Sequence, residues 1–141
     1  MSDVFEKESI ASDLAHRVIA AAEAKATEMG VPMVIAVCDE SGVLKAFSRM
    51  DGAALLSVQI AQDKAHTAVG FGMPSGAWHD FIKDDPPLAA GAVGGIDRLV
   101  IFGGGFPITI DGRIVGAIGV SGGHYSQDEE VAEAGLAVIA G

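Results

Sequence analysis

The sequence predicts an α/β protein of the α+β kind, in which helices flank a mostly antiparallel sheet of five strands. Helix-like and strand-like periodicities alternate along the chain in the order α-β-β-α-(α)-β-β-β-α. Turn sequences join neighbouring strand-like segments directly, and strands joined by a tight turn run antiparallel. A length of 141 residues fits one domain, so we expect residues 1–141 to form a single unit.

Composition restricts the partners and the compartment. The formal net charge is −10 and the Lys and Arg residues are scattered singly, which argues against nucleic acid and anionic membranes as partners. We expect a cytoplasmic protein, because the start of the chain is polar and no apolar run approaches the roughly 20 residues of a membrane-spanning helix. Cys38 is the only cysteine, so an intramolecular disulfide is excluded. The mean hydropathy of +0.39 predicts apolar surface that is buried between copies in a homo-oligomer.

The first half of the chain contains two helical segments separated by a hairpin. Apolar residues recur at helical spacing from Ser9 to Met29, and Gly30 supplies a stop. Short apolar runs on either side of a turn predict strands, and a second amphipathic helix follows. The strands are expected at Met33–Cys38 and Val43–Arg49, and the helix at Ala54–Phe71.

The second half is predicted to hold three strands and a final helix. The expected elements are a short helix at Ser75–Lys83, strands at Arg98–Phe102, Phe106–Ile110 and Arg113–Val120, and a helix at Gln127–Ile139. Ser126 and Glu129 have the spacing of a capping box for that last helix. Residues 88–96 are rich in Ala and Gly without periodicity, so the sequence does not determine their conformation. The glycines at 103–105 open a strand instead of a helix, which makes them a poor phosphate loop.

Several motifs, in one order along nearly the whole chain, resemble the GlcG/HbpS family, also called DUF336 or haem-degrading domains. They are residues 34–39 with Gly42, and residues 47–52, 61–68, 103–108, 112, 116–123 and 127–129. The resemblance implies a profilin-like fold with a central five-stranded antiparallel sheet and assembly into dimers and higher oligomers. Some members bind haem, among them the C-terminal domain of a corrinoid adenosyltransferase, and others belong to glycolate or diol metabolism without a settled activity. Haem is therefore the expected cofactor, and the family fixes the fold better than the function.

His16 is the candidate iron ligand that this resemblance suggests. Haem-binding relatives carry an axial histidine on the first helix, and His16 is the histidine of the first predicted helix. At 100° per residue it lies opposite Leu14 and Val18, away from the core. A neutral imidazole there could ligate iron if a second subunit supplied the covering wall. The alternative is a solvated surface histidine.

Residues 121–128 form the segment richest in functional groups. Ser121, Gly122 and Gly123 let the backbone approach a ligand, and the helix that follows favours negative charge, so a carboxylate or a haem propionate is a natural guest. His124, with Asp128 four residues on, could be an oriented general base, and Tyr125 a proton donor or anchor. The alternative is a capped helix with exposed aromatic rings.

Two cations complete the candidates. Lys64 interrupts the apolar side of the second helix, so its ammonium group is paired, meets an anionic ligand or extends to solvent. Arg49 could bind a carboxylate through two hydrogen bonds, or it could pair with a neighbouring aspartate.

Three functions stay open at this point. The first is a haem-binding or haem-handling protein that uses His16. The second is a cofactor-independent enzyme for a small organic acid or ketone, with His124 and Tyr125 in acid–base roles and Lys64 and Arg49 binding the anion. The third is an accessory oligomer without catalysis. The family resemblance favours haem.

Overall fold

The computed structural model describes residues 2–140, and its centre is a four-stranded antiparallel sheet in the order β2-β1-β4-β3. The strands are β1 (Val34–Asp39), β2 (Leu44–Arg49), β3 (Gly105–Ile110) and β4 (Arg113–Ser121). The sequence places both hairpins correctly, because tight turns connect β1 to β2 and β3 to β4. The two hairpins join through the antiparallel β1–β4 pair.

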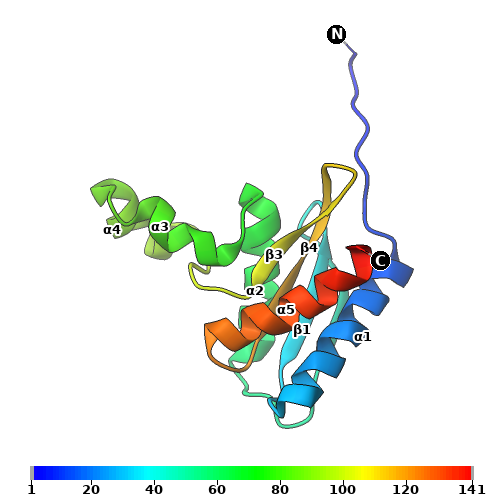
Figure 1. The fold of residues 1–141 in the computed structure, drawn as a ribbon. Helices are drawn as coiled ribbons and strands as arrows, with labels where there is room; N and C mark the ends of the chain where they lie inside the picture. Colours follow the sequence, from blue (N-terminus) through cyan, green and yellow to red (C-terminus); the bar gives the residue numbers. More distant parts are fainter. Residues whose placement is uncertain (1, 141) are drawn as a thin grey trace.

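Helices cover both faces of this sheet, which gives three layers (Figure 1). The helices α1 (Ser12–Met29) and α5 (Tyr125–Ala140) lie side by side on one face, and α2 (Ser57–Phe71) lies on the other. A short 3₁₀ turn (Ser75–Ala77) follows against α2 and β3, and α3 (Trp78–Ile82) and α4 (Pro86–Gly95) then project from the body as an arm (Figure 1). Within residues 2–140, no helix combines the length and the apolar character needed to cross a membrane.

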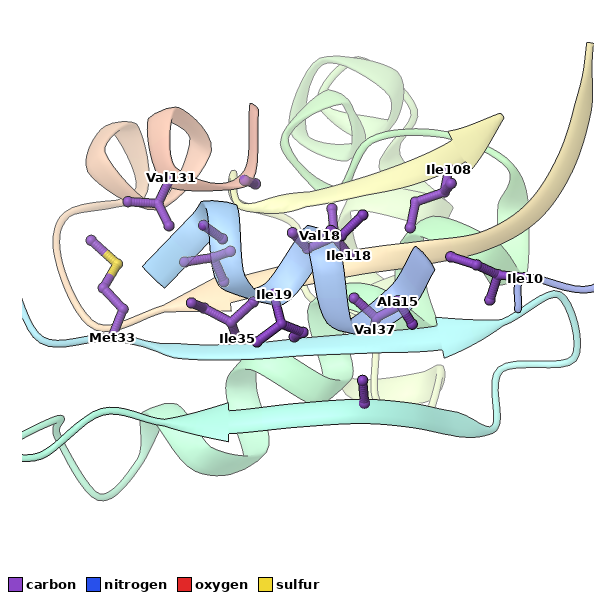
Figure 2. Packing of buried hydrophobic residues seen from close by; sticks show 14 of the residues in the cluster. Ile10, Ala15, Val18, Ile19, Met33, Ile35, Val37, Ile108, Ile118 and Val131 are labelled. Atoms are coloured by element: carbon purple, nitrogen blue, oxygen red, sulfur yellow. The ribbon is translucent and has the colours of Figure 1, made fainter. Parts of the chain in front are cut away.

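The main core lies between the sheet and α1 with α5. Val18 and Ile19 of α1 face Ile35 and Val37 of β1 and Ile118 of β4 (Figure 2). Burying an aliphatic side chain of this size contributes about 1.5–3 kcal/mol. The first five residues of β1 are all buried because both of its faces are covered, which explains why this strand reads as a continuous apolar run.

The prediction of a fifth strand at Arg98–Phe102 is wrong. Arg98 has a φ of 63°, in the left-handed region that a strand excludes. Side chains from elsewhere bond the backbone groups that a strand would use. Thr67 donates its hydroxyl proton to the Arg98 carbonyl at 3.0 Å and accepts from the Val100 N–H at 3.0 Å. Ser75 donates its hydroxyl proton to the carbonyl of Phe102 at 2.8 Å.

Most of the segment that the sequence left undetermined, residues 88–96, belongs to helix α4. Pro86 occupies the first helical turn, and the Asp85 carboxylate caps the helix by accepting from the Leu88 N–H at 3.3 Å. The helix carries no charged residue, and Ala92 is its only buried side chain among the described residues. An apolar helix that is exposed on most sides is unusual in an isolated soluble chain.

Candidate functional site

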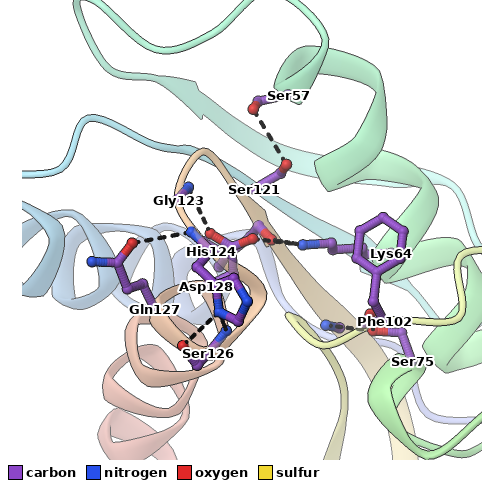
Figure 3. Close-up of polar contacts among 12 residues, drawn as sticks. Ser57, Lys64, Ser75, Phe102, Ser121, Gly123, His124, Ser126, Gln127 and Asp128 are labelled. Atoms are coloured by element: carbon purple, nitrogen blue, oxygen red, sulfur yellow. Dashed lines mark hydrogen bonds and ion pairs between the residues drawn. The ribbon is translucent and has the colours of Figure 1, made fainter. Parts of the chain in front are cut away.

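A buried ion pair between Lys64 and Asp128 joins α2 to the beginning of α5 (Figure 3). Lys64 Nζ donates to Asp128 Oδ2 and to the Val120 carbonyl, both at 2.8 Å. The side chains of Lys64 and Asp128 are 0% and 3% exposed. The ring centroid of Phe102 lies 5.1 Å from the ammonium nitrogen, within range of a cation–π contact. Of the alternatives that the sequence left open for Lys64, the structure therefore shows pairing.

Burial weakens the charged form of both partners. It lowers the pKa of Lys64 below its ordinary value, although the hydrogen bond and the negative charge of Asp128 act in the opposite direction. It also raises the pKa of Asp128, against the hydrogen bond and positive charge of Lys64. Perturbed groups of this kind next to a cleft are candidates for a functional site.

Gly104 and Gly105 make room for this pair, which the sequence did not reveal. A Cβ at Gly104, whose φ is 126°, would lie 2.5 Å from the Val120 carbonyl oxygen and 2.8 Å from Lys64 Nζ. A Cβ at Gly105 would lie 2.4 Å from the Lys64 carbonyl oxygen. The glycines therefore let α2 approach the sheet closely and let the lysine side chain reach Asp128.

The predicted pairing of Asp128 with His124 is not formed. Asp128 Oδ1 accepts from the Gly123 N–H at 3.0 Å, while its other oxygen binds Lys64. His124 is exposed, and its Nδ1 accepts from the Ser126 N–H at 3.2 Å. Its ring lies against Tyr125 with the centroids 4.1 Å apart. The proposed orientation of His124 by Asp128 is thus replaced by two separate local contacts.

The capping box of α5 lies two residues earlier than predicted. The helix begins at Tyr125, and His124 is its N-cap. Gln127 Oε1 accepts from the His124 N–H at 3.0 Å, in the role predicted for Glu129. We expected this glycine-rich loop to hold an external anion, but the N–H groups of Gly123 and His124 are already bonded to side chains of the protein.

A cavity of about 480 Å³ lies beside the Lys64–Asp128 pair, because Phe102 lines the cavity and its ring also contacts the Lys64 ammonium group. The cavity is lined by Gly76, His79, Asp80, Ile101, Phe102, Gly103, Tyr125 and Glu129. Of the predicted catalytic residues, Tyr125 lines the cavity, whereas Lys64 and Asp128 lie behind its wall. The sequence missed Glu129 as a site residue, although its spacing of four from Tyr125 places both on one helix face.

His16 lies on the opposite side of the molecule from α2. It is exposed on α1, and its Nδ1 is 2.7 Å from the Ser12 carbonyl oxygen. A carbonyl only accepts, so Nδ1 carries the proton and the neutral ring keeps its lone pair on Nε2. A hydrogen bond of this type fixes the tautomer of metal-binding histidines. Within residues 2–140 no three His, Cys, Asp or Glu side chains cluster to hold a bare metal ion.

Arg49 and Ser121 do not share a site with His16. Arg49 and Ser121 are each the cross-strand partner of Val34, so the side chains of Arg49, Ser121 and Val34 point to the same face of the sheet. Val34 packs against Ala61 of α2, which identifies that face as the one opposite α1. Ser121 Oγ donates to Ser57 Oγ of α2 at 3.2 Å. The exposed Arg49 forms no ion pair within residues 2–140, contrary to the aspartate pairing considered above.

Gly122 serves packing. A Cβ at this glycine, whose φ is 151°, would lie 2.7 Å from the Pro32 carbonyl oxygen. The predicted cofactor-binding residues thus fall on different faces of the sheet, and their roles remain predictions.

These features define a three-layer α/β protein with an exposed histidine on α1, whose Nδ1 lies at a carbonyl oxygen, and a cavity beside a buried ion pair. A model of the family described as haem-degrading protein HbpS-like matches residues 10–137. The chain belongs to this family. It is 38% identical over 122 residues, 86% of each chain, to an uncharacterised 15.0 kDa protein from the dhaT–dhaS intergenic region of Citrobacter freundii.

The chain is also similar to three further proteins. The chain is 35% identical to the corrinoid adenosyltransferase PduO of Citrobacter freundii over 88% of its own length but only 37% of that enzyme. The crystal structure of Klebsiella pneumoniae ORFY, a DUF336 protein, is similar with a TM-score of 0.87, 31% identity and coverage of 99% and 97%. The crystal structure of the PduOC–haem complex is similar with a TM-score of 0.82, 28% identity and coverage of 93% and 95%.

Proposed function

We propose that this protein binds haem and that His16 is the axial ligand. The observation that carries the proposal is the tautomer of His16, whose Nδ1–H donates to the Ser12 carbonyl and leaves Nε2 free to ligate. The likeness to a haem-bound relative supports the same ligand. Bound haem would supply redox-active iron, whose reactivity depends on the axial ligand and the surrounding polarity.

The surroundings of His16 fit a porphyrin on one side. A porphyrin supplies four nitrogen ligands itself, so one exposed imidazole suffices where a bare ion needs a cluster. Ser12 and Ala20, one turn away in either direction, are small and exposed, which leaves space beside the imidazole. The other side of the haem has to be covered, and a second copy of the chain is the covering group that we propose.

Helix α4 supports self-association. Its uncharged surface includes Val93, which is 54% exposed, and Leu88, which is 37% exposed. Such a helix is stable in water when a partner covers it. We therefore propose a homo-oligomer in which the projecting arm is buried.

The alternative of an enzyme for a small organic acid receives less support. Lys64, one of the two cations assigned to its substrate, is fully buried and bonded to Asp128. Arg49 is the cross-strand neighbour of Val34, on the face of the sheet that α2 covers, and it does not line the cavity beside Tyr125. Among the described residues that line the cavity there is no Lys or Arg to hold an acid.

Titration with hemin tests the proposal. We expect a saturable Soret change that His16→Ala weakens strongly, because the axial bond is lost. His79→Ala and His124→Ala are matched controls, since both remove an exposed histidine from another surface. Equal Soret titrations for His16→Ala and the controls would refute His16 ligation, and linear, non-saturating uptake by the parent protein would refute specific haem binding.

A further inference from the structure

The cavity beside the Lys64–Asp128 pair contains an unpaired carboxylate. Glu129 is half-buried, and its carboxylate forms no hydrogen bond or ion pair within residues 2–140. It lies over a floor of two glycines. A Cβ at Gly103 would lie 2.4 Å from Glu129 Cδ, and a Cβ at Gly76 would lie 3.3 Å from Oε2. Because both residues are glycines without side chains, the Glu129 carboxylate fits against the floor of the cavity.

Aromatic rings form part of the walls. Phe102 and Tyr125 line the cavity and are 44% and 49% exposed, which is high for rings of this size. His79 of α3 contributes a third planar ring to the lining. Exposed ring faces attract cations and stack against flat apolar groups. The volume of about 480 Å³ is that of a small-molecule site.

The charge balance of the cavity is negative. No Lys or Arg is among its lining residues. Asp80, the other lining carboxylate, is compensated by Lys83 at 3.1 Å. Lys64 lies behind Phe102, where Asp128 already neutralises it. Lys64 attracts Glu129 electrostatically, but its hydrogen bonds go to Asp128 and the Val120 carbonyl. Glu129 is thus the one lining carboxylate of the described cavity without a hydrogen bond or ion pair, and the lining offers no Lys or Arg to hold an anionic ligand.

We propose that this cavity binds a small organic cation with a flat apolar body, in which an amidinium or ammonium group pairs with Glu129. A charge-assisted hydrogen bond to the carboxylate supplies the polar contact, and Phe102 and Tyr125 supply the apolar one. The site is separate from the haem site proposed at His16, and neither proposal depends on the other.

The test uses three compounds of nearly the same shape and different charge: benzamidine as the cation, benzamide as the neutral form and benzoate as the anion. Calorimetry measures the affinities, and amide chemical shifts locate the binding. We expect saturable binding of benzamidine, with shifts at His79 and at the start of α5, and none for benzoate. Glu129→Gln should weaken benzamidine roughly tenfold or more, because a hydrogen bond to a charged group is lost.

Glu130→Gln is the matched control, since it removes the same charge from the neighbouring, exposed position of α5. It should leave benzamidine binding unchanged, and so should His16→Ala. Three outcomes would each overturn the proposal: no benzamidine binding, benzamide or benzoate bound as tightly as benzamidine, or equal losses in Glu129→Gln and Glu130→Gln. The shift map of the parent protein decides the location independently of the folding of any variant.

Discussion

Replacing Lys64 by methionine is expected to destabilise the protein far more than replacing an exposed lysine. The substitution keeps the length of the side chain but removes two hydrogen bonds of 2.8 Å and leaves the Asp128 carboxylate buried. Breaking a buried pair by removing one partner costs about 3–5 kcal/mol, because the remaining charge has no compensation. The N–H of Gly123 remains as a donor to Asp128, so we expect the lower part of that range.

Urea unfolding followed by the fluorescence of Trp78, the only tryptophan, measures this cost. Comparisons are made at one protein concentration, because association would add to the apparent stability. Lys83→Met is the control. Lys83 pairs with Asp80 on the surface at 3.1 Å, and such pairs contribute about 0–1 kcal/mol.

A double-mutant cycle separates the pair from its surroundings. Lys64→Met and Asp128→Asn together remove both charges, so the double variant should be more stable than the sum of the single effects predicts, by about 2 kcal/mol. Additive effects, or a loss in Lys64→Met no larger than in Lys83→Met, would show that the ammonium and the carboxylate do not depend on each other.

Three other consequences can be measured. Gly104→Ala should lower the free energy of unfolding in urea by about 2 kcal/mol or more, because its Cβ would meet the Val120 carbonyl. Gly70→Ala is the control, and it should be neutral or slightly stabilising because the space around Gly70 is open. Equal effects of the two substitutions would contradict the tight packing at Gly104. Val93→Asp on the exposed arm should reduce the mass measured by light scattering with the circular dichroism unchanged, and an unaltered mass would exclude α4 from the interface. The pKa of Lys64 is lowered in the fold, so the unfolded chain holds this proton to a higher pH than the folded chain does. The difference in free energy of unfolding between the parent protein and Lys64→Met should therefore rise with pH between the lowered pKa and the ordinary pKa of 10.5. A difference that does not change with pH would argue against a lowered pKa.

Local sequence patterns predict the elements that depend on local interactions. The periodicity of α1 and α2 and the two hairpin turns suffice to predict these elements, because their hydrogen bonds join residues that are close in sequence. The prediction of a strand at Arg98–Phe102, after α4, is wrong for the opposite reason. This segment looks like a strand, but its backbone is bonded by Thr67, which lies 31 residues before Arg98. No local pattern reports such a partner.

The candidate site shows the same division. The sequence indicates that a lysine on an apolar helix face needs a partner. It does not reveal that the partner is Asp128, 64 residues further on. Gly104 and Gly105 are visible in the sequence, but the reason for them emerges only once Lys64 is placed against them.

The consecutive acids Asp128 and Glu129 explain why the beginning of α5 has the opposite ligand preference from the one its sequence suggests. Successive residues of a helix are rotated by about 100°, so the two carboxylates point to different places. Asp128 turns inward, where it accepts from Lys64 and from the N–H of Gly123. It thereby occupies the place that an external carboxylate would take. Glu129 turns into the cavity, and no Lys or Arg is among the described residues that line it. One carboxylate thus acts as the internal anion of the glycine loop, and the next gives the open cavity its negative charge, so a cation is the ligand that this end of the protein attracts.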